Sequence, residues 1–345
     1  MNADTHTTVA GRAFDGQRSP CRVEDMAFTE LMAAYHERTR RTLDMRDLAA
    51  WGVIDERGGL TNAGALLADH SPLGQSRIVC TLWDGLPMAE GLGRAIDVVE
   101  LGGSVISQLR EAVAFVHSHS CEGDASGATS PDYPERAVTG TILNAILHRD
   151  YTQAGSRVRV DMYDDRVEVW SPGVMIGGES RLFLNLPDVP AVRRNPLLAD
   201  CFGRLGLLEN GDGIKEIGRT YERYRKLVKC RLPEFGSDTA GFRVVLWNLN
   251  YAGTADAGDG ANGSRAFARA SRQICQLISR KPNISIEAMS RSIRLSKRQV
   301  MIYIGRLREA KKIARVGNKR SGEWKILDED YAGTFDKSEE LRFKK

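Results

Sequence analysis

One stretch of the chain, residues 156–173 (SRVRVDMYDDRVEVWSPG), constrains the fold more than any other. Two runs of alternating apolar and polar residues flank Asp164 and Asp165, a pair typical of turns. Alternation with a period of two turns one face of each strand toward a core and the other toward water. The stretch therefore predicts an antiparallel hairpin within a half-buried sheet, and the two aspartates are interpreted as ordinary turn residues.

The sequence on both sides of this hairpin predicts both helices and further strands. A helix is expected over residues 135–151 (ERAVTGTILNAILHRDY), with Ile142, Ala145 and Ile146 on its inner side. Further strands are expected in SRIVCTLWDG and FRVVLWNLNY, and further helices in RNPLLADCFGRLGLL and GDGIKEIGRTYERYRKLV. The chain is thus of the mixed helix-and-strand class.

Composition excludes several classes of protein. No apolar run approaches the length that spans a bilayer, so no membrane partner is expected. The first twenty residues carry no apolar core segment typical of a secretory signal, which predicts a cytoplasmic location. The six cysteines form no CxxC pair, which argues against a zinc ribbon or a redox motif and favours reduced, buried thiols.

Changes in composition along the 345 residues suggest several segments. We expect a disordered N-terminus (1–24), a helical lead-in (25–75), a central domain of helices and strands (76–252), a Gly-rich linker (253–264), a small basic domain (265–327) and a charged tail (328–345).

Charge is distributed unevenly between these segments. Residues 264–327 hold 17 Lys and Arg against 3 acids, whereas the rest of the chain holds 32 basic against 42 acidic residues. A basic module joined to an acidic body indicates that one end of the protein meets a polyanion.

The basic segment has the pattern of a winged helix-turn-helix. One helix ends before Pro282, a second follows Ser285, a third begins at Lys297, and two short strands flank NKRSG. The third helix would place its N-terminal residues in the major groove of double-stranded DNA. The predicted DNA contacts are Lys297, Arg298 and Gln299 on that helix, and Asn318, Lys319 and Arg320 at the tip of the wing. The alternative is that the module docks proteins or dimerises.

The stretch NAILHRDY (144–151) gathers an amide, a histidine, an arginine and an aspartate. A protein-kinase catalytic loop would need Asn five residues after Asp150, where Gly155 stands, and no DFG is present. His148 has no second histidine at helical spacing, which argues against zinc, and no GxxxxGK[ST] loop is found. The stretch therefore has to be interpreted with its wider context.

Three ordered motifs provide that context: ILNAILHRDY, then YDDRVEVWSPG, then RRNPLLADCFGRLGLLENGDGI. In this order they resemble the bacterial ATP-binding proteins with a histidine-kinase-like (GHKL-type) ATPase domain that are often labelled RecG-like helicases or transcriptional regulators. The resemblance covers about residues 45 to 250 and extends to the winged helix. It implies a GHKL-like α/β sandwich, with helices on one face of a mixed, mostly antiparallel sheet.

The resemblance also implies roles for particular residues. Asn144 matches the Asn of the family's first box and would hold Mg²⁺ against the phosphates of ATP. His148 and Arg149 follow at helical spacing and would face the phosphates.

Three glycines match the family's nucleotide-binding turns. Gly173, in SPG, falls at the adenine-side turn. Gly211 and Gly213 fall in the phosphate loop, where backbone N–H groups at a helix start can approach an anion.

The sequence departs from the family where hydrolysis would be catalysed. These ATPases place a Glu one helical turn before the Asn to polarise water, and here that position is Gly140. Asp212 puts a negative charge where a phosphate would lie. The sequence thus favours nucleotide binding and leaves the enzymatic activity open.

The function predicted from the sequence is a DNA-binding transcriptional regulator whose GHKL-like domain binds ATP and Mg²⁺. Two copies would bind a palindromic site as a homodimer. The alternatives are an ATPase of DNA metabolism and an adaptor that uses its winged helix to dock proteins.

Overall fold

The computed structural model of the chain describes residues 13–86, 93–120, 130–175, 192–208, 213–225, 230–251, 263–293, 297–309, 311–316 and 322–327. The chain divides into two compact units. Unit 1 comprises Met1–Val116 and Tyr133–Leu249, and unit 2 comprises His117–Asp132 and Asn250–Lys345. The predicted linker falls largely outside the described residues.

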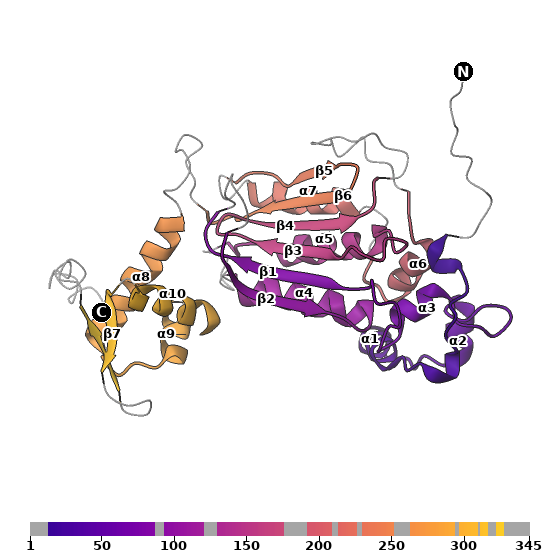
Figure 1. Ribbon diagram of the computed structural model, residues 1–345, viewed down its shortest axis with the longest axis horizontal. Coiled ribbons are helices and arrows are strands. Elements are labelled where there is room, and N and C mark those ends of the chain that lie inside the picture. The colour runs from indigo at the N-terminus through magenta and orange to yellow at the C-terminus, as the bar shows by residue number, and fades with distance from the viewer. Residues whose placement is uncertain are drawn as a thin grey trace, which may run out of the picture. The chain divides into compact units, whose positions relative to one another are not determined.

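Unit 1 is built on a six-stranded sheet in the order β2-β1-β3-β4-β6-β5 (Figure 1). Its strands are β1 (Ile78–Trp83), β2 (Ala95–Leu101), β3 (Val158–Met162), β4 (Arg166–Pro172), β5 (Glu234–Ser237) and β6 (Gly241–Trp247). Strands β1 and β3 pair in parallel, and the other neighbours pair antiparallel. The predicted mixed, mostly antiparallel sheet is therefore confirmed, as is the hairpin β3–β4 about Asp164 and Asp165.

Helices cover one face of this sheet. They include α4 (Val105–Ser118), α5 (Glu135–His148) and α7 (Gly213–Arg225), which lie behind the strands in Figure 1. Alternate strand residues such as Val158, Val160, Val167 and Val169 point toward them and are at most 2% exposed. Removal of this apolar surface from water is the main stabilising term of unit 1.

The N-terminal part of unit 1 packs beside this sandwich. It contains two 3₁₀ turns, η1 (Phe14–Gly16) and η2 (Val23–Asp25), and the helices α1 (Thr29–Thr39), α2 (Met45–Ala50) and α3 (Asn62–Leu67). The buried Asp15 accepts a hydrogen bond from the backbone N–H of Leu198 in helix α6 (Pro196–Arg204). The expected disorder through residue 24 is therefore wrong for residues 13–24, because the sequence pattern does not reveal such long-range backbone contacts.

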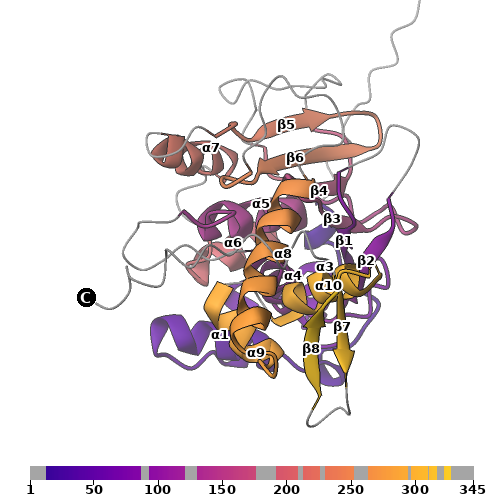
Figure 2. The ribbon, with the colours of Figure 1, turned by 90° about the vertical axis from the view of Figure 1, so that its left-hand side faces the viewer.

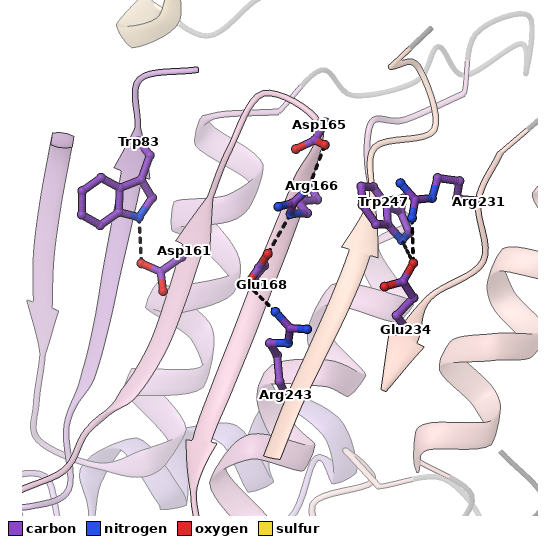
Figure 3. A network of polar contacts seen from close by, with 9 residues as sticks. All are labelled: Trp83, Asp161, Asp165, Arg166, Glu168, Arg231, Glu234, Arg243 and Trp247. Atoms are coloured by element: carbon purple, nitrogen blue, oxygen red, sulfur yellow. Dashed lines mark hydrogen bonds and ion pairs between the residues drawn. The ribbon is translucent and has the colours of Figure 1, made fainter. Parts of the chain in front are cut away.

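The other face of the sheet carries polar and aromatic side chains (Figure 3). No helix among the described residues of unit 1 covers it, and we call it the helix-free face. Arg166 on β4 contacts Glu168 at 2.7 Å and lies over the ring of Trp247. Trp83 donates a hydrogen bond to Asp161, and Arg231 lies 3.3 Å from the ring centroid of Trp247. Most charges on this face therefore have a partner on a neighbouring strand or loop.

The turn aspartates at the edge of this face are less ordinary than predicted. Asp165 is 7% exposed and forms a 3.0 Å ion pair with Arg166. Burial, with a smaller contribution from Asp165, raises the pKa of Asp164 to about 6. The two aspartates lie in the turn, as predicted, and Asp165 is in addition buried.

Unit 2 holds three helices followed by a hairpin (Figure 2). They are α8 (Gly263–Arg280), α9 (Ile286–Ile293), α10 (Lys297–Glu309), β7 (Ile313–Val316) and β8 (Glu323–Ile326). A separate core contains Ile278, Met289, Val300 and Trp324, and the Trp324 indole donates a hydrogen bond to the carbonyl of Ile284. The element order follows the sequence pattern. No helix in the described part of the chain is long and apolar enough to cross a membrane.

Candidate functional site

The candidate site lies along one side of α5. Gly140, Asn144 and His148 follow one another at intervals of four residues, so they occupy the same face of the helix. Asn144 is 8% exposed. A Cβ on Gly140 would lie 3.4 Å from Cγ1 of Ile217, which shows that α7 packs against this end of the face.

Helix α7 runs antiparallel to α5. The Tyr221 hydroxyl in α7 donates a hydrogen bond to the carbonyl of Trp247, which pairs with the first residue of β4. The carboxyl end of α5 lies at the opposite end of β4, where Ser171 donates to the carbonyl of Ala145. The N-terminus of α7, at Gly213, is therefore directed toward the carboxyl end of α5. The positive end of a 13-residue helix thus points toward the Asn144–His148 end of the face.

The carboxyl end of α5 is closed by side chains from three separate motifs. The last carbonyls of a helix have no partner within the helix. Here Ser171 donates to Ala145, Tyr151 donates to Ile146 at 3.1 Å, and Asn195 donates to Leu147 at 2.9 Å. Asn195 also donates to the carbonyl of Arg149, and it is fully buried. The NAILHRDY, SPG and RNP motifs therefore meet at one helix end, which explains why they occur together in the sequence.

Most polar groups of the HRDY sequence stabilise the fold. Asp150 accepts hydrogen bonds from Thr152 and Gln153. Arg149 is 1% exposed, donates to the carbonyl of Ser156 at 2.6 Å and lies over the ring of Tyr151. These contacts use Nη2 of the guanidinium, whereas its Nε and Nη1 atoms are buried without a hydrogen-bond partner among the described residues. The predicted phosphate contact of Arg149 therefore stays a prediction.

His148 is only partly buried, unlike the three residues that precede it in α5. Burial, together with the nearby guanidinium groups of Arg194 and Arg193, lowers the pKa of its imidazole to about 4. The ring is therefore neutral at neutral pH and lies in a locally positive environment, which favours a bound anion.

Arg193 and Arg194 were not predicted as site residues. No ligand contact was predicted in the RNP segment (194–196), and Asn195 has a structural role, because it donates hydrogen bonds to two carbonyls at the end of α5. The doubled arginine before Asn-Pro was the available signal. It could not be used because only the fold places residue 194 beside His148.

Gly173 holds the turn after β4 against this corner. Its φ of +110° is one that side chains rarely adopt, and a Cβ there would lie 2.7 Å from Cβ of Asp150. The same Cβ would lie 3.4 Å from the guanidinium carbon of Arg194. The structure thus brings Gly173, Arg194 and His148 to one place. Gly213 is the first residue of α7, and Gly211 lies outside the described residues.

The predicted DNA contacts are only partly described. Lys297 is the exposed first residue of α10 and pairs with Glu287 of α9 at 2.8 Å. The backbone of Arg298 and Gln299 lies in the first turn of α10, while their side chains lie outside the described parts. Asn318, Lys319 and Arg320 are outside the described residues altogether.

The six-stranded mixed sheet and the helices on one of its faces form an α/β domain. Residues 155–246 match the family described as "Putative ATP-dependent DNA helicase recG C-terminal". These residues are less than half of the chain, and over them the predicted resemblance to the RecG-like ATP-binding proteins is confirmed.

One solved structure supports the fold. The crystal structure of the DIP2311 protein from Corynebacterium diphtheriae matches with a TM-score of 0.55 and 19% sequence identity. The match covers 93% of this chain but only 65% of the length of that protein. No curated protein matches the chain.

Proposed function

We propose that this protein is a DNA-binding regulator whose central domain binds a magnesium–nucleoside triphosphate without efficient turnover. The observation that carries this proposal is the face of α5. It keeps Asn144 and a positive corner at His148, but it has Gly140 where the related ATPases have their catalytic Glu. Such a site is suited to holding a charged ligand and lacks the group that would activate water.

The residues present fit a magnesium–nucleotide. Mg²⁺ binds through one or two protein oxygens plus phosphates and water, and Asn144 supplies an amide oxygen of that kind. No three His, Cys, Asp or Glu side chains gather into a metal site within the described residues. The antiparallel α7 directs its positive end toward the same corner, and the Arg194 Nε is buried with no acceptor among the described residues. When bound, Mg²⁺ would neutralise phosphate charge.

Loss of the general base is expected to suppress hydrolysis. Glycine offers no proton acceptor, and Ile217 packs against the position from α7. The family description names an ATP-dependent helicase, so an ATPase remains the second candidate. The ATPase alternative predicts Mg²⁺-dependent phosphate release by the wild-type protein that is lost in Asn144→Ala.

Unit 2 is proposed to be the DNA-binding module. Three helices and a hairpin are the layout of a winged helix-turn-helix, with α10 as the recognition helix. The Lys297–Glu287 pair is exposed on both sides, at 59% and 57%, so exchange of the carboxylate for a DNA phosphate would cost little. The strong positive charge of residues 264–327 supports the same assignment. We further propose that two copies bind a palindromic site and that nucleotide binding biases their spacing.

Calorimetric titration with a non-hydrolysable ATP analogue tests the nucleotide proposal. With Mg²⁺ present, the wild-type protein should bind, and Asn144→Ala should weaken binding by about tenfold or more, as expected for a charged contact. Asn250→Ala is the control and should bind normally, because this asparagine is exposed and bonds to Ser130 and Asp132. Absence of heat with the wild-type protein would overturn the proposal.

Electrophoretic mobility shifts with a pool of double-stranded DNA test the proposed DNA binding by unit 2. Binding should weaken steeply as salt rises, and Arg298→Ala should weaken it further, because lost phosphate contacts reduce counterion release. The control is Arg46→Ala in helix α2, far from unit 2 in sequence. Binding to a protein partner that DNA does not displace would instead favour the docking alternative.

A further inference from the structure

We propose that Arg194 is the residue that recognises the phosphate chain of the ligand at this site, and that its neighbour Arg193 is not. The inference rests on the proposed nucleotide site and adds a specificity-determining contact to it. It names the ligand chemistry as a polyphosphate, which the guanidinium fork suits because it offers parallel N–H donors.

The backbone holds Arg194 in place from both sides. Its neighbour Asn195 is bonded to two carbonyls at the end of α5, which fixes the chain directly beside His148. The Arg194 Nη2 donates to the carbonyl of Val174, and its guanidinium carbon lies against the Cα side of Gly173. Three elements (α5, the turn after β4 and the start of α6) therefore position one cation.

The hydrogen bonding of Arg194 is incomplete. Its Nε atom is buried, and no acceptor lies within reach among the described residues. Buried donors are normally paired in folded proteins, and a charged donor without an acceptor is especially costly. A phosphate oxygen at this corner would supply the missing acceptor.

Arg193 differs from Arg194 because its guanidinium forms an ion pair with a carboxylate. Its Nη1 lies 3.0 Å from Oδ1 of Asp200, and both side chains are largely exposed, at 44% and 62%. The carboxylate near Arg194 is Asp150, which interacts with it electrostatically and already accepts hydrogen bonds from Thr152 and Gln153. Arg193 is therefore a matched control with the same charge, next in sequence, but with a carboxylate partner.

The test compares three probes by calorimetry: a non-hydrolysable ATP analogue with Mg²⁺, adenosine, and inorganic triphosphate. Arg194→Ala should weaken the ATP analogue and triphosphate by roughly 10- to 100-fold, the range for loss of a hydrogen bond to a charged group. Adenosine affinity should not change, because adenosine has no phosphate. Arg193→Ala should change each affinity by less than about threefold, as expected for an exposed pair.

The outcomes separate this inference from the proposed function. Equal weakening of adenosine and the ATP analogue would show that Arg194 only supports the fold, and unchanged affinities would show no role; either result overturns the inference while nucleotide binding stands. If the wild-type protein binds triphosphate through Arg194 but no nucleotide, the inference stands and the proposed function fails. Binding of none of the three probes overturns both. Arg194→Lys, which keeps the charge and loses the fork, should recover only part of the affinity.

Discussion

The carboxyl end of α5 and the helix-free face of the sheet both gather polar side chains, but they use them differently. At the helix end, Ser171, Tyr151 and Asn195 bond to backbone carbonyls that have no other partner in the helix. On the helix-free face, side chains bond mainly to one another, as Arg166 does to Glu168. The hydrogen bonds at the helix end pair buried carbonyl groups that would otherwise lack a donor. The ion pairs on the helix-free face replace hydrogen bonds that water could form with the same side chains.

This difference also accounts for the polar residues of the HRDY and RNP sequences without assigning each a catalytic role. Arg149, Asp150, Tyr151 and Asn195 hold the helix end and the following turns together. In the proposed site, the ligand contacts fall instead to Asn144, His148 and Arg194. A motif of polar residues can therefore be mostly architectural.

The largest effect is expected from Asn195→Ala. This change removes two buried 2.9 Å hydrogen bonds and leaves the carbonyls of Leu147 and Arg149 without that donor. The free energy of unfolding of the domain, measured by urea denaturation, should fall by about 2–4 kcal/mol. Asn250→Ala removes two hydrogen bonds of the side-chain amide at an exposed site, and the free energy of unfolding should fall by less than about 1 kcal/mol. Equal losses in the two variants would contradict the comparison.

An intermediate effect of opposite sign is expected from Asp164→Asn at the edge of the helix-free face. Burial raises the pKa of Asp164 to about 6 in the folded protein, from an ordinary value of 3.8. The unfolded chain therefore loses this proton first, and stability is lost as pH rises from about 4 to about 6.

At pH 7 the Asn variant should be more stable by roughly 1–3 kcal/mol, and this gain should disappear below pH 4. Urea denaturation between pH 4 and pH 8 measures it, with the exposed Asp25→Asn as control. A gain that does not depend on pH would exclude ionisation of Asp164 as its cause.

The smallest effect is expected from Arg243→Ala on the helix-free face. Its ion pair with Glu168 is 3.4 Å long and the arginine side chain is 43% exposed, while Glu168 keeps its shorter pair with Arg166. The loss in free energy of unfolding should stay below about 0.5 kcal/mol and shrink further in high salt. A loss above about 1.5 kcal/mol would contradict the comparison, because it would show that contacts on this face stabilise the protein as much as those at the helix end.

Local sequence was sufficient for much of the fold. Alternation predicted the hairpin β3–β4, helical spacing predicted α5 and its buried side, and the charge of residues 264–327 marked the basic module. Asn144 could also be proposed as a site residue from the sequence, because it stands in an ordered set of motifs that resembles a known family. These features depend on neighbours in sequence, or on periodicities that each element carries by itself.

Only the tertiary structure decided which polar residues of those motifs are free to act. Residues 149 and 194 are both arginines near the end of α5, yet one points into the domain and the other lies beside His148. The positions of these two side chains depend on Ser156, Asn195 and the turn at Gly173, which the fold brings together from distant parts of the chain. The raised pKa of Asp164 likewise comes mainly from burial, which the Asp-Asp sequence of the turn does not reveal. Sequence determined the elements and the candidate chemistry, whereas packing decided which side chains hydrogen-bond to the backbone and which do not.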